Sequence, residues 1–148
     1  MDITQLSLDD HQEQRRLSAF LEVHAEAEEQ FFYPELLQLG NGAGDKDSPE
    51  AETEDAIEDH NEIRDAVATV ADHRVGSNPW FDAVATANKA NGDQMAEEER
   101  EGLTDFRRNA ELALRHTLAV AFATFEAKHV TGVKAVDKDP QDYIDEHE

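Results

Sequence analysis

Cysteine is absent from this chain of 148 residues, and proline, glycine and aromatic residues are few. Without cysteine the chain can form no disulfide and offers no thiolate for a zinc site, an iron–sulfur cluster or nucleophilic catalysis. Long apolar runs are also missing, so no membrane-spanning segment is predicted. The first residues, MDITQLSLDDH, lack the apolar core of a secretory signal peptide. We therefore expect a soluble, cytoplasmic protein.

Positive charge is scarce, because 13 lysine and arginine residues stand against 35 aspartate and glutamate residues, for a formal net charge of −22. A surface of this sign repels nucleic acids and anionic membranes, so neither is expected as a partner. The acidity is typical of proteins from a salt-rich cytoplasm and also of alanine-rich, high-GC bacterial proteomes. The sequence does not separate these two sources.

Strand signals are nearly absent, and helix-forming residues dominate the chain. Glycine, proline and capping residues divide it into expected helices at about 7–39, 49–74, 78–101 and 104–129. Ser48 followed by Pro49 is a typical helix start. A short additional helix is predicted from about residue 140. We expect an all-α protein with a helical bundle over residues 1–130 and a C-terminal tail over residues 131–148.

Histidine and carboxylate side chains stand within the apolar stripes of these amphipathic helices. A core normally excludes such groups unless they are paired or bind a metal. The clearest case is His24 and Glu28, which lie one turn apart on one face of the first helix and can bind the same ion. Taken alone, such a pair is also typical of a surface ion pair beside a bulky core.

Two internal similarities support the metal-binding interpretation. The segment QMAEEEREGLTDF aligns with HAEAEEQFFYPEL at a constant offset of 70 positions, which places Glu98 on Glu28. The segment DDHQEQR around His11 resembles EDHNEIR around His60 at an offset of 49. Each half of the chain thus holds an Asp-His helix and then a helix with the pattern [His/Gln]-x-x-x-Glu. Bundle proteins build two-metal sites from four such helices, and ligands without sulfur favour non-haem iron, with manganese or zinc as alternatives.

The motifs DDHQEQRRL, LEVHAEAEEQFFYPELL, IEDHNEIRDAV and MAEEEREGLTDF resemble the hemerythrin-like, or HHE cation-binding, domain family over about residues 6–106. The resemblance implies an up-down four-helix bundle around a di-iron centre bridged by oxygen and carboxylates. It also implies binding of dioxygen or a related small ligand, or iron-linked sensing. The metal ligands that it implies are His11, His24, Glu28, His60, Gln94 and Glu98, with Glu28 and Glu98 as the bridging carboxylates.

Gln94 departs from the family pattern, because a glutamine stands where a histidine is expected. One metal would then be bound more weakly, with Glu97 or His116 as substitute ligands. Arg64 stands one turn after His60, where oxygen-carrying members have another histidine. We expect aromatic residues to form a dry wall beside the site: Phe20, Phe31, Phe32, Trp80 and Phe81.

The spacing between His11 and His24 is the second departure, because 13 residues are too few for the helix end, turn and helix start that the family places there. No glycine, proline, asparagine or aspartate in this stretch signals a turn, so we expect the first two helices to be fused. Thirteen helical steps rise about 20 Å and rotate the side-chain direction by about 220°. The two histidines therefore cannot bind one metal centre from the same chain.

That geometry predicts a domain-swapped homodimer, in which the arm with His11 crosses to a second copy. The alternatives are a turn in this stretch or a bundle without its first helix. The favoured function is a non-haem di-iron protein that binds or senses dioxygen, nitric oxide, peroxide or iron itself. A peroxide- or oxygen-activating di-iron enzyme and a metal-free helical interaction module stay open. Binding is favoured over catalysis, and no catalytic residue is identified.

Overall fold

The computed structural model describes the backbone of residues 3–148 and the side chains from residue 17 onward. The elements within these residues are helices: α1 (Ile3–Phe31), α2 (Tyr33–Leu39), α3 (Pro49–Ala71), α4 (Asn78–Arg100), α5 (Gly102–Asn109), α6 (Leu112–Lys128) and α7 (Pro140–His147). The all-α prediction is confirmed. Across residues 3–148, none of these helices has the length and apolar character that crossing a lipid bilayer requires.

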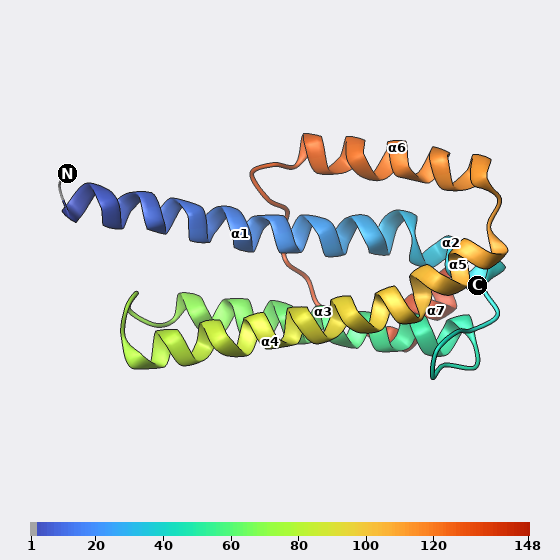
Figure 1. Cartoon of the computed structure of the whole chain (residues 1–148), viewed down its shortest axis with the longest axis horizontal. Helices are drawn as coiled ribbons and strands as arrows, with labels where there is room; N and C mark the ends of the chain where they lie inside the picture. Colours follow the sequence, from blue (N-terminus) through green and yellow to red (C-terminus); the bar gives the residue numbers. More distant parts are fainter. Residues whose placement is uncertain (1–2) are drawn as a thin grey trace.

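The four long helices run alternately up and down and lie in layers (Figure 1). α3 and α4 pack closely against each other, and α1 packs on α3. α6 returns along the opposite side of α1, away from the α3–α4 pair. The short helices α2, α5 and α7 gather at one end of the molecule. The apolar core is centred there, on Phe32, Tyr33, Leu36, Leu37, Ala56, Ile57, Phe106, Ala110, Tyr143 and Ile144.

The starts of α3 and α4 follow from local capping. The Ser48 hydroxyl accepts a hydrogen bond from the Ala51 amide at 3.2 Å, and the Ser77 hydroxyl accepts one from the Trp80 amide at 3.3 Å. Each cap is followed by a proline in the first helical turn, where no hydrogen bond is lost. α4 has the expected bounds, whereas α3 ends at Ala71, slightly before the expected end near residue 74.

One continuous helix, α1, occupies the stretch in which two helices were expected to be fused, so this prediction is confirmed. The expected helix over 7–39 is nevertheless interrupted at Phe32. Pro34 lacks a backbone N–H and cannot continue a helix, so it stands in the first turn of a new one, α2. The break places Tyr33 and Leu36 in the core, where both side chains are fully buried.

The single helix expected over 104–129 is wrong, because α5 and α6 are separated by Ala110 and Glu111 in extended conformations. The break has no glycine or proline to signal it. Ala110 is buried in the apolar core, and the Asn41 side-chain amide donates a hydrogen bond to Asn109 at 2.9 Å. These contacts let α5 pack against α2 and α3 while α6 packs on α1.

α6 is rich in apolar residues, and yet none of them is buried. Leu112 and Val120 are 57% and 68% exposed. A helix that is apolar on all sides is normally buried. Leu17 and Phe20 on α1 and Met95 on α4 are exposed as well. We call the apolar surface formed by these parts of α1, α4 and α6 the open face.

The C-terminal residues return to the bundle, and the predicted extra helix is present as α7. Tyr143 and Ile144 are buried in the core. In the extended segment before α7, the main chain of Lys138 exchanges two hydrogen bonds with the Asn61 side chain on α3, at 2.7 and 3.1 Å. The tail therefore covers the side of α1 and α3 that lies away from the open face.

Candidate metal-binding site

Two histidines converge on one buried glutamate. His24 Nε2 lies 2.9 Å from Glu28 Oε1, one turn along α1, and His60 Nε2 lies 3.2 Å from Glu28 Oε2. Glu28 and His60 are buried, whereas the His24 side chain is 42% exposed. The structure thus brings together the pair expected on α1 and the histidine expected from α3.

Glu98 joins this group from α4, as the internal repeat predicts. The Tyr33 hydroxyl donates a hydrogen bond to Glu98 Oε1 at 2.7 Å. Burial, and then the negative charge of Glu28, raise the pKa of Glu98 to about 7. Two carboxylates from different helices therefore face each other, which is unfavourable unless a proton or a cation lies between them.

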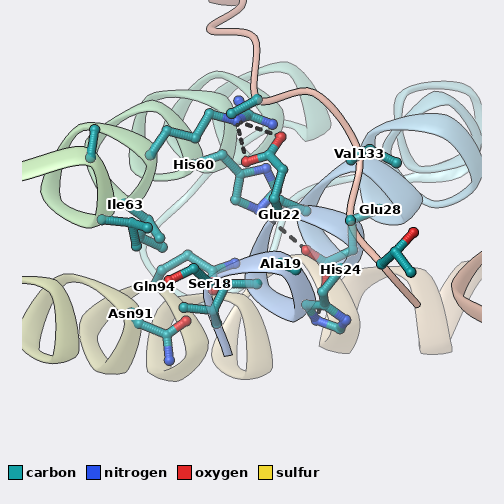
Figure 2. Close-up of a pocket in the computed structure, with 18 residues that line it drawn as sticks. Ser18, Ala19, Glu22, His24, Glu28, His60, Ile63, Asn91, Gln94 and Val133 are labelled. Atoms are coloured by element: carbon teal, nitrogen blue, oxygen red, sulfur yellow. Dashed lines mark hydrogen bonds and ion pairs between the residues drawn. The ribbon is translucent and has the colours of Figure 1, made fainter. Parts of the chain in front are cut away.

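Gln94 lies one turn before Glu98 on α4 and is buried. It lines a cavity of about 300 Å³ together with His24, Glu28 and His60. Figure 2 shows these four side chains, which reach the cavity from α1, α3 and α4. The structure therefore unites five of the six residues that the resemblance implies.

His11 is the sixth. Its backbone belongs to α1, but its side chain lies outside the described residues. Because α1 is continuous, about 20 Å of helix separate His11 from His24 in the same chain. The role of His11 stays a prediction. Of the substitute ligands, Glu97 lines a separate small cavity beside Gln94 and Glu98, and His116 is exposed on α6.

A second group of charged side chains contacts His60 on its Nδ1 side, away from Glu28. His60 Nδ1 lies 2.8 Å from Glu29 Oε1. Arg64 Nη2 donates to the same oxygen at 2.9 Å, and Arg64 Nε donates to both carboxylate oxygens of Glu22 at 3.0 Å. Lys138 of the tail forms an ion pair with Glu29. Arg64 therefore neutralises the charges of the buried carboxylates of Glu22 and Glu29, a role different from that of a metal ligand.

Mutual pairing sets the protonation of the inner group. The hydrogen bond to Glu28 raises the pKa of His24 to about 9. Burial alone would lower the pKa of His60, but its hydrogen bonds to Glu28 and Glu29 raise it to about 9. Burial alone would raise the pKa of Glu28, but both histidines together lower it to about 2. In the cation-free protein at neutral pH, two imidazolium groups thus flank one carboxylate.

The chemistry of these residues fits a metal ion. In the part of the chain with described side chains, no three histidine or carboxylate groups already surround one point. Gln94 Nε2 is, however, buried without a hydrogen-bond partner, and the buried atoms Glu28 Oε2 and His60 Nε2 face each other at 3.2 Å; these residues line one cavity. A cation would satisfy Glu28 and a deprotonated His60, and a half-turn of the Gln94 amide would present its oxygen. Imidazole and carboxylate ligands suit iron, manganese or zinc.

The site lies between a cavity and a groove. The 300 Å³ cavity is lined on its apolar side by Ala25, Ile63 and Val67, and residues of the segment 131–135 between α6 and α7 line it as well. A groove of about 810 Å³ lies on the open face between α1, α4, α5 and α6, and Glu28 and Glu98 line it as well. The site is therefore covered on the side of the tail and open on the other.

The predicted aromatic wall is only partly found. Phe31 and Phe32 line the groove, and Phe20 stacks on His24 with ring centroids 6.0 Å apart. Trp80 and Phe81 contact each other at the start of α4 and line neither the cavity nor the groove. The prediction is therefore wrong for these two residues, because α4 begins at the far end of the bundle from the site.

Sequence reasoning missed Glu22, Glu29, Tyr33 and Lys138. Glu29 is 2% exposed, but it directly follows Glu28 and nothing in the pattern separates the two roles. Lys138 stands in a stretch without hydrophobic periodicity, so no feature of the sequence predicts its contact with Glu29. Arg64 was noticed only as a departure, since its partners lie 35 and 42 positions away.

A family model described as the hemerythrin HHE cation binding domain matches residues 5–117. This range is more than half of the chain and includes His11, His24, Glu28, His60, Gln94 and Glu98. No curated protein and no solved structure gives a significant match to the chain.

Proposed function

We propose, from the premise that this chain belongs to the hemerythrin HHE cation-binding domain family, that it binds non-haem iron and serves to bind or sense a small ligand. The ligands considered are dioxygen, nitric oxide and peroxide, or iron itself. Membership of the family supports cation binding as such. The observation that carries the proposal is the buried group of Glu28, His60 and Gln94 around one cavity, in which Gln94 Nε2 has no hydrogen-bond partner and His60 Nε2 faces Glu28 Oε2.

Iron would be held between α1, α3 and α4. Glu28 and Glu98 provide carboxylates from two helices, and His24 and His60 provide imidazole nitrogens. Gln94 offers a weaker neutral oxygen, so one coordination position would be held loosely. When bound, iron supplies a redox-active Lewis acid with a position open to a small ligand.

Glu29 and Arg64 prepare His60 for this role. The Glu29 carboxylate on Nδ1 directs His60 Nε2 toward Glu28 and the cavity, an arrangement that commonly orients metal-binding histidines. Arg64 balances the charge that this carboxylate brings into the interior. The apolar wall of the cavity offers few hydrogen-bonding groups to water and therefore favours small, uncharged ligands.

The test is the iron content per chain in protein purified without chelator, with absorption spectra recorded before and after exposure to air. We expect about two irons per chain, as in di-iron carboxylate bundles, and near-ultraviolet bands that respond to oxygen. Glu28→Gln and His60→Gln should lose the iron. His116→Gln, which changes an exposed histidine on α6, is the matched control and should keep it.

The other possible results of the iron measurement distinguish between the alternatives. One metal per chain would show that Gln94 has reduced the site to a mononuclear one. Zinc in place of iron would overturn the proposed role with redox-active ligands. A chain that takes up no metal, and whose melting temperature does not respond to added iron, would contradict the proposal and support a metal-free interaction module, since a ligand of the folded state must stabilise it.

A further inference from the structure

The groove on the open face has the character of a helix-binding surface. Apolar side chains from four helices line it, among them Phe31, Met95, Leu103, Leu118 and Phe122. Its volume of about 810 Å³ is much larger than a small ligand of the iron site requires. Met95 and Leu103 are 48% and 43% exposed there. A helix laid along this groove would cover the face of α6 that carries Leu118 and Phe122, in a long apolar helix with no buried residue.

The internal repeat indicates which segment fits beside Glu98. In the first pairing, the segment EDHNEIR on α3 meets Glu28, and His60 of that segment contacts its carboxylate. Glu98 is the repeat counterpart of Glu28, and DDHQEQR is the counterpart of EDHNEIR. The second pairing therefore joins the segment around His11 to Glu98, and Glu98 lines the groove.

A chain cannot form this second pairing with its own segment. α1 is continuous from Ile3 to Phe31, so residue 11 is held about 25 Å along the helix axis from Glu28. Glu98 lies at the level of Glu28 and Tyr33. The segment that matches the groove must therefore come from a second copy.

Charge complementarity supports the same occupant. Two of the groove residues, Arg107 and Arg115, form no ion pair within the described part of this very acidic chain, and Arg115 Nε is buried without a partner. The segment around His11 carries the acidic residues Asp9, Asp10 and Glu13, followed by Arg15 and Arg16, so its acidic end would face these arginines. Any acidic partner could meet the same arginines, so it is the repeat that assigns the groove to a second copy.

We propose that the N-terminal half of α1 from a second copy fills this groove, and that the exchange is reciprocal. The inference rests on the proposed function in one respect, since the exchanged arm brings His11 of each copy to the iron site of the other. The two α1 helices then pair antiparallel about a two-fold axis. With residue 11 of one copy level with residues 24–28 of the other, the axis passes near Leu17 and Phe20, which are 61% and 56% exposed in the single chain.

The first test is the oligomeric state of the full chain, by light scattering after size exclusion. We expect a dimer of twice 16.6 kDa at micromolar concentration, in about 0.15 M and about 2 M KCl, because salt screens the repulsion between acidic copies. Phe20→Glu places two like charges at the axis and should give a folded monomer. Val130→Glu changes a residue that is 75% exposed outside the groove and should leave the dimer intact. A wild-type monomer at both salt concentrations would overturn the proposal.

A covalent test uses the absence of cysteine from the chain. Leu17→Cys should form a disulfide between copies under mild oxidation, because residue 17 lies near the axis. Val130→Cys is the control and should stay monomeric on a non-reducing gel. A wild-type dimer in which Leu17→Cys does not cross-link would show that the copies meet through another face.

The last test separates arm exchange from simple dimerisation. His11→Ala and Glu98→Ala proteins, unfolded and refolded together, form mixed dimers in which one of the two sites regains all its residues. About one quarter of the wild-type iron content should return if mixing is statistical, whereas each variant alone binds little. No recovery in proven mixed dimers would refute the exchange. A dimer without iron in the wild-type protein would contradict the proposed function but not the dimer.

Discussion

The two sides of α1 differ in what they bury: one side buries charged groups, and the other leaves apolar groups exposed. On the side facing α3 and the tail, Glu22, Glu29, His60 and Arg64 are buried, each with an oppositely charged partner. On the side facing the open face, apolar residues such as Phe20 are exposed. A buried charge needs only a partner and hydrogen bonds, which one chain can supply. Apolar side chains are removed from water only when other side chains cover them, and the single chain leaves those of the open face uncovered.

The comparison assigns different origins to stability on the two sides. The closed side depends on a few specific pairs, so losing one partner leaves an uncompensated buried charge. The open face depends on what covers it, so single substitutions there matter for association more than for folding of one chain. The substitutions and treatments below test this difference, from the largest expected effect to the smallest.

Arg64→Met breaks the closed side most directly. It leaves Glu22 and Glu29 buried without the guanidinium that pairs with both. We expect a loss of about 3–5 kcal/mol in the free energy of unfolding, measured by urea denaturation. Lys89→Met removes an exposed ion pair with Asp93 and should leave the unfolding curve unchanged. A loss below about 1 kcal/mol for Arg64→Met would mean that the buried pairs contribute little.

Removal of the metal tests whether a bound cation contributes to the stability of the closed side. If iron is present at about 100 times its dissociation constant, its removal by a chelator costs about 2.7 kcal/mol. The melting temperature should therefore fall, and added iron should restore it. His60→Gln should have the lower melting temperature from the start and no response to the chelator. An equal response in the variant would place the bound metal elsewhere.

Glu52 is a buried carboxylate on α3 with no cationic partner among the described residues. Burial, and then the nearby Asp105, raise its pKa to about 8. The folded pKa is above the unfolded value of about 4.3, so stability from this group is complete below that value and is lost as pH rises toward 8.

Glu52→Gln should remove that pH dependence, and its amide oxygen can still accept the hydrogen bond from the Ala43 amide. Near pH 9 we expect the variant to be more stable than the wild type by about 1–3 kcal/mol, with little difference near pH 4. Thermal melts across this range provide the measurement. A wild-type advantage at pH 9 would contradict the raised pKa.

Tyr143→Phe loosens the tail without removing its apolar contact. The Tyr143 hydroxyl donates to the main-chain oxygen of Glu29, next to the candidate ligand Glu28. We expect a loss of about 1 kcal/mol in the free energy of unfolding, the usual value of one buried hydrogen bond. Iron content should not change. Loss of iron in this variant would instead show that the tail positions the site.

Val120→Ser on α6 is expected to have the smallest effect. Val120 is 68% exposed and lines neither the cavity nor the groove, so the free energy of unfolding should change by less than about 0.5 kcal/mol. Ile57→Val, a smaller change in the core, should cost about 0.5–1.5 kcal/mol and serves as the comparison. A larger cost at Val120 would show that α6 is covered in solution by more than α1.

Local rules were enough for part of the fold and of the site. The sequence determined the helical class, the start of α3 after Ser48, the start of α4 near Asn78, and the continuous α1. It also determined that His24 and Glu28 share a face, because residues four apart on a helix always do. The repeat correctly placed Glu98 beside Glu28.

Only the tertiary structure decided the rest. It ended α5 at Ala110, where burial in the core outweighs good local helix propensity. It paired Arg64 with Glu22 and Glu29, and it brought Lys138 from the tail to Glu29. Such contacts depend on which helices become neighbours and at what level along their axes. Helical periodicity sets the face on which a side chain lies, but the packing of whole helices sets what that face meets.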